Sequence, residues 1–273
     1  MRGEGRAHAA ISILNGTATG IGCSLAVAGG VEATWDWGKL PSFESDPACD
    51  AEVAQAVLSS LPRHLGEAAI RTRSTFPARR GLKTSSGSAA ALLRAAYASL
   101  GSRLSNPELI TAAVAVCRTA GVTLTGALDD QAAVVEGGCH LADSRNGTRL
   151  RSFTTPRWHV AIWVPEASIP KDSVAMVSTA AVVAGARRLV DDLGLANLPD
   201  ALTANGRLFT ALYRAAGLPV TQRPADVALN HGALGAGLSG TGPAVAALFD
   251  ERVELPAIPG GIWHWTRAVP EAS

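Results

Sequence analysis

The chain of 273 residues is long enough for one large or two ordinary domains, since domains usually run to about 100–200 residues. Hydrophobic residues make up 47% and charged residues 17%, a composition typical of a globular protein and unlike that of a disordered or fibrous chain. The formal net charge of +1, from 24 basic and 23 acidic residues, argues against nucleic acid or an anionic membrane surface as a partner.

Cysteine usage and the amino terminus indicate the compartment. Cys23, Cys49, Cys117 and Cys139 are widely spaced and form no Cys-x-x-Cys pair, so we expect reduced, mostly buried thiols. The amino terminus shows no cleavable signal pattern, and no apolar run approaches the roughly 18 residues of a membrane span. We therefore expect a cytoplasmic protein that acts as a monomer or homodimer on small molecules.

The first half of the chain begins with strand patterns. Residues 8–38 predict short strands with glycine turns, one of them at Gly29-Gly30. Residues 51–61 predict a helix that ends at Pro62, and residues 69–76 alternate as a half-buried strand does. A hairpin-rich start is therefore expected.

Two further helices are expected before the middle of the chain. Residues 85–100 are rich in alanine and leucine, and we expect the serines at their start to receive the free backbone N–H groups. Residues 107–118 predict the second helix, with Asn106 as its cap and Gly121 at its close.

A polar stretch over residues 143–155 predicts a domain boundary, which gives an amino-terminal domain over 1–150 and a carboxy-terminal domain over 151–273. Strands and helices mix without strict alternation beyond it, which favours α+β layers. The expected elements are a strand over 158–164, helices over 174–193 and 202–215, and a strand over 243–249.

Residues 77–88 lie between an expected strand and an expected helix and can hold phosphate. Glycine lets the backbone approach a ligand closely, a helix start offers unpaired N–H groups, and hydroxyls can bind phosphate or magnesium. By itself such a cluster is also compatible with a flexible turn before a serine-capped helix. It is not a Walker A loop, because lysine does not directly follow Gly81.

A second constellation places Asp129 and Asp130 at the start of an expected helix. Because adjacent helix residues do not share a face, we expect at most one of these carboxylates to point into a given site. Taken alone, either acid is also compatible with a helix cap or a first-turn acid.

A glycine pattern that overlaps the stretch 238–244 resembles a nucleotide-binding motif by spacing alone. Gly235, Gly237 and Gly240 satisfy the spacing of a dinucleotide-binding fingerprint, yet they follow a helical pattern and precede a strand pattern. That motif requires a strand before it and a helix after it, so we reject NAD binding.

Three motifs together resemble the GHMP kinase superfamily. Gly81-Leu82-Lys83-Thr84-Ser85 is similar to its second motif, with lysine and an extra serine as in the archaeal-type shikimate kinases. Thr125-Gly126-Ala127-Leu128-Asp129-Asp130 looks like the aspartate element of that branch, and 238–244 looks like the third motif. Weaker matches at 13–20 and 202–206 extend the resemblance, which spans residues 8–249, while Ile21 and Ala9-Ala10 depart from the branch pattern.

The resemblance implies an α+β, two-domain GHMP kinase fold with ATP and the acceptor in the inter-domain cleft. It implies Asp129 as the catalytic base, with Asp130 and Lys83 beside it, and Mg²⁺ at Ser85 and Ser86, while a second metal ligand stays unassigned because Glu108 lies at the far end of its helix. The residues implied for ATP are Pro77, Arg80, Gly81, Leu82, Lys83, Thr84, Ser85, Ser86, Gly87 and Ser88. Those implied for the acceptor are Asn15, Thr17, Thr19, Thr125, Asn205, Gly240, Thr241 and Gly242.

The implied activity is ATP-dependent phosphorylation of a shikimate hydroxyl, giving shikimate phosphate and ADP. The alternatives are a GHMP kinase for another polar alcohol, such as a cyclitol or a sugar-like intermediate, and a degenerate protein that only binds nucleotide. Homoserine kinase fits less well, because that relative usually lacks the aspartate. A substrate carboxylate would need a cation, for which the candidates are Arg145, Arg149, Arg151 and Arg207.

Overall fold

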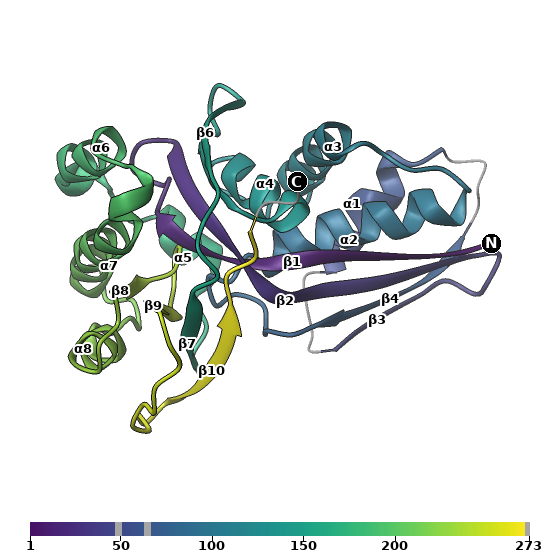
Figure 1. Cartoon of the computed structure of the whole chain (residues 1–273). Helices are drawn as coiled ribbons and strands as arrows, with labels where there is room; N and C mark the ends of the chain where they lie inside the picture. The colour runs from purple at the N-terminus through teal and green to yellow at the C-terminus, as the bar shows by residue number, and fades with distance from the viewer. Residues whose placement is uncertain (47–50, 63–66, 271–273) are drawn as a thin grey trace.

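The computed structural model describes residues 1–46, 51–62 and 67–270 (Figure 1). Three cysteines in these ranges, Cys23, Cys117 and Cys139, are free and buried, as predicted. Cys49 lies outside the described residues.

The amino-terminal half forms a mixed sheet with the order β3-β4-β2-β5-β6, in which β1 pairs with β2. Only β3 and β4 are parallel among the pairs that the described strands make. The strands are β1 (Arg2–Leu14), β2 (Ile21–Trp37), β3 (Ser42–Asp46), β4 (Ala68–Ser74), β5 (Cys139–Asp143) and β6 (Thr148–Phe153).

The first two strands are longer than the glycine pattern predicts. β1 and β2 pair along nearly their whole length, and Gly30 lies opposite His8 at a register shift. Gly30 has φ of 136°, which permits a bulge inside the strand, so β2 bends there and continues instead of ending. The prediction of short strands was therefore wrong.

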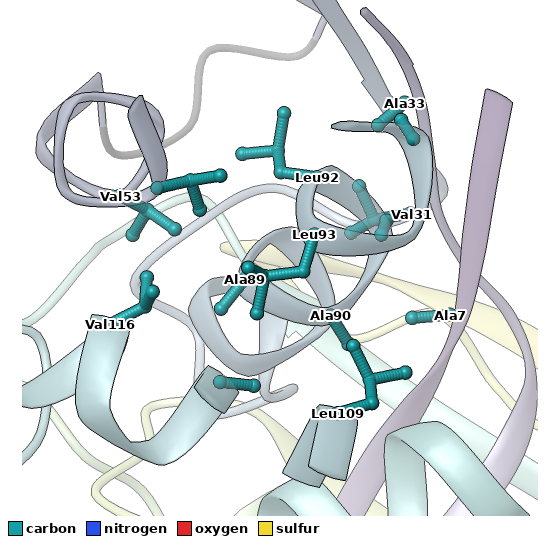
Figure 2. Close-up of a cluster of buried hydrophobic side chains, with 14 of the residues drawn as sticks. Ala7, Val31, Ala33, Val53, Ala89, Ala90, Leu92, Leu93, Leu109 and Val116 are labelled. Atoms are coloured by element: carbon teal, nitrogen blue, oxygen red, sulfur yellow. The ribbon is translucent and has the colours of Figure 1, made fainter. Parts of the chain in front are cut away.

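Four helices cover one face of this sheet (Figure 1). Figure 2 shows the buried side chains between them, with Leu92 and Leu93 of α2 among Val31 of β2, Val53 of α1 and Val116 of α3. Small alanines on α2 let the helix lie close to β1 and β2. The helices are α1 (Ala51–Ser60), α2 (Thr84–Ser99), α3 (Asn106–Thr119) and α4 (Leu128–Glu136).

The carboxy-terminal half contains an antiparallel sheet with the order β10-β7-β9-β8. The helices of this half gather beside that sheet (Figure 1). The strands are β7 (His159–Pro165), β8 (Gly235–Leu238), β9 (Val245–Phe249) and β10 (Gly261–Arg267). The helical segments are α5 (Lys171–Ala175), η2 (Ala180–Val182), α6 (Val183–Asp191), η3 (Leu195–Asn197), α7 (Leu198–Ala215) and α8 (Arg223–Asn230).

The expected helix over 174–193 is interrupted. α5 ends at Ala175, and regular helix resumes only at η2 and α6. Ser178 and Thr179 occupy the break, and their side chains compete with the backbone for hydrogen bonds, which favours turns over helix interiors.

Two helix caps also differ from the predictions. α2 is preceded by Lys83 in a left-handed conformation, without a capping side-chain hydrogen bond, so lysine and not serine occupies the cap position. α3 is capped by Ser105, whose backbone N–H and hydroxyl both donate to the Glu108 carboxylate, at 2.8 and 2.6 Å. The N-cap of α3 is therefore Ser105 and not Asn106, and the Glu108 carboxylate takes part in this cap.

One hydrophobic cluster joins the two sheets. Ile11 and Leu25 of the first sheet pack with Val160, Leu202 and Ala246 of the second half. Residue 150 lies inside β6, a strand of the first sheet, so the predicted domain boundary falls within a strand. The division into 1–150 and 151–273 stays a prediction. No described helix is long and apolar enough to cross a membrane.

The close contact between α2 and β1 predicts a strict requirement for glycine. A β-carbon at Gly5 would overlap the carbonyl oxygen of Ala91, so we expect Gly5→Ala to lower the free energy of unfolding by about 1–3 kcal/mol. Gly194→Ala is the control, because a β-carbon there meets only the Asn197 amide oxygen at 3.8 Å. Urea unfolding measures both variants, and equal stabilities would contradict the assigned contact.

Candidate active site

A loop over residues 75–83 connects β4 to α2. Arg79, Gly81 and Lys83 all have positive φ, at 59°, 82° and 58°. Left-handed conformations in non-glycine residues cost free energy and persist where the surrounding structure enforces them, often at functional sites. Lys83, the residue before α2, makes no capping side-chain hydrogen bond, and the start of the helix carries the positive end of the helix dipole.

Ser239, in the turn between β8 and β9, fixes this loop. Its hydroxyl donates to the Gly81 carbonyl at 2.7 Å and accepts the Ser12 N–H at 3.1 Å. A β-carbon at Gly81 would overlap the Ser239 carbonyl, which explains the glycine. Two glycine stretches far apart in the sequence therefore lie against each other and against β1.

The two arginines of the loop point in different directions. Arg80 donates to the carbonyls of Pro165, Glu166 and Ala78 at 2.9, 2.7 and 3.1 Å, which ties the loop to the end of β7. Arg79 lines the cleft instead. Sequence analysis chose Arg80 and overlooked Arg79, since no sequence signal distinguishes adjacent arginines.

Asp129 and Asp130 lie in the first turn of α4. Ala127 precedes the helix in a left-handed conformation, and the Leu128 N–H donates to the Ser144 hydroxyl at 3.0 Å. Both carboxylates line the same cleft. The expectation that at most one would point into the site was wrong, because side chains at a helix start can turn toward a shared partner beyond the helix surface.

That shared partner is Ser24 of β2. Its Oγ lies 2.9 Å from Asp129 Oδ2 and 2.7 Å from Asp130 Oδ1. Lys83 Nζ lies 2.9 Å from Asp130 Oδ1, and the two side chains are only 14% and 13% exposed. The start of α2, the start of α4 and β2 thus meet at one polar cluster, and sequence analysis missed Ser24.

Burial and neighbouring charges set the protonation of this cluster. Burial raises the pKa of Asp129 to about 7, the Asp130 charge adds to the rise, and Lys83 and the Ser24 hydrogen bond oppose it. Burial acts to lower the pKa of Lys83, but the charges of Asp130 and Asp129 outweigh it and the pKa is raised. Asp129 can therefore gain and lose a proton near neutral pH, while Lys83 stays positive.

A network around Asn15 forms another wall of the cleft. The Asn15 amide donates to the Gly240 carbonyl at 2.8 Å and to the Tyr213 hydroxyl at 3.2 Å. The Asn15 N–H donates to the Asn205 side-chain oxygen at 2.9 Å, and the Thr17 N–H donates to the Asn15 side chain at 2.9 Å. Asn205 of α7, which lies outside the cleft wall, thus holds Asn15 in position.

The cleft has a volume of about 120 Å³. Most of the sequence-predicted site residues line it; those that do are Asn15, Thr17, Gly81, Leu82, Lys83, Thr84, Ser85, Ser86, Thr125, Asp129, Asp130, Gly240 and Thr241. The remaining predicted residues lie outside its wall, namely Pro77, Arg80, Gly87, Ser88, Thr19, Asn205 and Gly242. Wall residues that sequence analysis missed include Ser12, Arg79, Val122 and Ile169.

The candidate carboxylate-binding arginines have other contacts. Arg149 pairs with Glu136 at 2.7 Å, Arg151 donates to the Leu193 carbonyl at 2.7 Å, and Arg145 lies against Gly20. Neither these three nor Arg207 lines the cleft.

Among the described residues, no three His, Cys, Asp or Glu side chains form a cluster that could hold a metal. Gly235 and Gly237 of the glycine fingerprint lie in β8 and Gly240 lies in the turn to β9, so a strand follows the fingerprint where a dinucleotide-binding motif has a helix.

Comparison with known proteins identifies the family. Two family domains match the chain, the GHMP kinases N terminal domain at residues 51–138 and the GHMP kinases C terminal domain at residues 191–258. A shikimate kinase from Halobacterium salinarum is 34% identical over 263 residues, which cover 92% of this chain and 89% of that protein. The chain belongs to the GHMP kinase family. A shikimate kinase from Methanothrix thermoacetophila is 32% identical, covering 92% of this chain and 86% of the relative.

Solved structures agree with the predicted GHMP kinase fold. Mevalonate kinase from L. major, in complex with R-mevalonate, matches with a TM-score of 0.72 and 17% identity over 99% of this chain and 97% of that one. Homoserine kinase from Cytophaga hutchinsonii matches with a TM-score of 0.69 and 19% identity, over 92% and 86%. The prediction of a two-domain α+β fold is confirmed, and as a GHMP kinase the protein is an ATP-dependent phosphotransferase with an alcohol acceptor.

The position of Lys83 predicts a role in nucleotide affinity. We expect Lys83→Ala to raise the Kd for ATP about tenfold, because it removes a cation beside the start of α2 and exposes the phosphates to an unpaired Asp130. Lys39→Ala is the control, since Lys39 pairs with Asp36 on the surface, where its side chain is 65% exposed. Calorimetric titration measures the Kd for ATP in both variants, and equal Kd values would contradict a role of Lys83 in ATP binding.

Proposed function

We propose that this GHMP kinase transfers the γ-phosphoryl group of ATP to a ring hydroxyl of shikimate, giving shikimate phosphate and ADP. The observation that carries the proposal is that one cleft contains the uncapped start of α2, the Asp129 and Asp130 carboxylates, and the Asn15 network. These supply an anion-binding backbone, a base and a polar surface for an alcohol.

The start of α2 is the proposed phosphate site. The backbone N–H groups and the dipole of a helix start favour a polyphosphate, and Lys83 adds a nearby positive charge. The hydroxyls of Ser85 and Ser86 also line the cleft and suit Mg²⁺, a hard cation that takes oxygen ligands and usually keeps water and phosphate as its other partners. When bound there, Mg²⁺ would neutralise charge on the phosphates.

Asp129 is the proposed base. Its carboxylate accepts the proton of the acceptor hydroxyl as the oxygen bonds to the γ-phosphorus, and the bond from that phosphorus to the β-phosphate oxygen breaks to release ADP. A pKa of about 7 lets a substantial fraction of Asp129 ionise at neutral pH. Asp130 holds Lys83 beside it, and positioning of the reactants supplies most of the remaining rate.

The acceptor is proposed to bind between Asn15, Thr17, Thr125 and Thr241. These residues line the cleft together with the Asp129 carboxylate. Arg79 is the arginine of the cleft wall, so it is the best-placed guanidinium for an anionic group, either an ATP phosphate or the carboxylate of shikimate.

The choice of shikimate is supported by the lysine and double-aspartate motifs and by relatives named as shikimate kinases at 28–34% identity. A cyclitol or sugar-like alcohol is the alternative acceptor. We also infer a cytoplasmic location, which the free thiols of Cys23, Cys117 and Cys139 support.

Removal of the proposed base should stop the reaction while the protein still binds ATP. We expect Asp129→Asn to lower kcat at least roughly a hundredfold, because general-base catalysis is lost while ground-state contacts to the phosphates persist. Asp226→Asn, at an aspartate in the first turn of α8, is the matched control and should keep wild-type turnover. A coupled ADP-release assay measures kcat, and retention of more than about a tenth of the rate would refute the assignment.

The acceptor is tested with shikimate, its methyl ester and uncharged cyclitols. We expect shikimate to have the highest kcat/KM, because a cation in the cleft favours its carboxylate over the neutral ester. Mass spectrometry of the products with each alcohol supplies the measurement. If a neutral cyclitol has the higher kcat/KM, the protein is still a kinase but shikimate is the wrong acceptor.

A further inference from the structure

Ser24 sits between the two carboxylates and has no role in the reaction described above. It is fully buried in β2, and its single hydroxyl lies within hydrogen-bond distance of both Asp129 Oδ2 and Asp130 Oδ1. A hydroxyl carries one hydrogen and can donate to only one acceptor at a time. If both carboxylates were ionised, one of the two short oxygen contacts would lack a proton.

The surroundings distinguish the two carboxylates. Lys83, from the start of α2, pairs with Asp130 Oδ1 at 2.9 Å and keeps Asp130 compensated. Asp129 has no ion pair of its own among the described residues and is 5% exposed. The Cys23 thiol of β2 is the remaining titratable group beside Asp129, and Tyr213 of α7 lies near Lys83.

We propose that Ser24 is a positioning residue whose hydroxyl turns between the two aspartates during the reaction. While Asp129 is ionised, Ser24 donates to it and holds the carboxylate toward the acceptor. Once Asp129 has taken the acceptor proton, its carboxyl group is neutral and a weaker acceptor, so Ser24 turns its hydrogen to Asp130, which pairs with Lys83. No covalent bond to Ser24 forms or breaks, and Asp129 returns its proton to solvent after product leaves.

This inference rests on the proposed role of Asp129 as base and adds a partner whose hydrogen bond depends on the charge state of Asp129. Burial and the Asp130 charge raise the pKa of Asp129, whereas the hydrogen bond from Ser24 lowers it. Ser24 and Asp130 therefore act on this pKa in opposite directions. Their removal should therefore move the pKa of Asp129 in opposite directions.

The test is the pH dependence of kcat/KM, which reports ionisation in the free enzyme. In the wild type we expect the rate to rise with pH through about 7, the pKa of Asp129. Ser24→Ala should shift this limb upward by about one pKa unit, which lowers kcat/KM at pH 7 roughly fivefold and restores it near pH 9. Asp130→Asn should shift the limb downward.

Ser152→Ala is the matched control. Ser152 is also a strand serine of the first sheet, and its hydroxyl contacts buried His140 at 2.9 Å, away from the cleft. It should leave the limb unchanged. Ser24→Thr keeps the hydroxyl and should keep the wild-type limb, and if Ser24→Ala does not fold, Ser24→Cys repeats the test with a weak donor. An equal loss at every pH in Ser24→Ala or Ser24→Cys, with an unmoved limb, would overturn the proposal.

A second measurement separates this inference from the proposed function. Carbon-13 NMR of labelled aspartate carboxyls follows the titration of Asp129 without substrate, with the signal assigned by its loss in Asp129→Asn. An upward shift of its pKa in Ser24→Ala, in a protein that does not phosphorylate shikimate, would sustain the hydrogen bond from Ser24 to Asp129 and refute the proposed acceptor. Unchanged titration in an active enzyme would do the reverse.

Discussion

The ion pair between Lys83 and Asp130 is the contact on which the site depends. It joins the residue before α2 to the first turn of α4, and Ser24 links the same carboxylates to β2. Both partners are largely shielded from water, so removal of either would leave a charge with poor compensation. The pair therefore fixes the distance between the loop before α2 and the acidic residues of α4, which the proposed phosphoryl transfer requires.

Backbone constraints keep this pair in place. Lys83 and Ala127 each adopt left-handed conformations directly before their helices, so both helices start abruptly at the cleft. Such conformations cost about 1–3 kcal/mol each, and the packing around them must offset that cost. Ser239 contributes by binding the Gly81 carbonyl, and Gly22 leaves room for Asp129 where any β-carbon would collide with its carboxylate.

The shared core between the two sheets explains how distant segments form one site. Ile11 and Leu25 pack with residues of β7, α7 and β9, so the two halves are held by continuous hydrophobic contact. The Asn15 network uses this arrangement, because Asn205 and Gly240 of the second half orient a side chain that follows β1. A cleft built this way has preformed walls, which would reduce the entropy lost when the proposed substrates bind.

The sequence by itself determined the family, the α+β class and most residues of the cleft wall, because short motifs around Gly81, Asp129 and Gly240 carry backbone and charge requirements that are local. Helices such as α1 and α3 were also predictable from periodicity. Only the tertiary structure decided that Arg79 faces the cleft while Arg80 ties down the loop, that both aspartates converge, and that Ser24 lies between them. The physical reason is that side-chain direction at loops and helix starts depends on partners that lie far away in the sequence, such as Pro165 for Arg80 and Ser24 for the two aspartates, which sequence spacing does not encode.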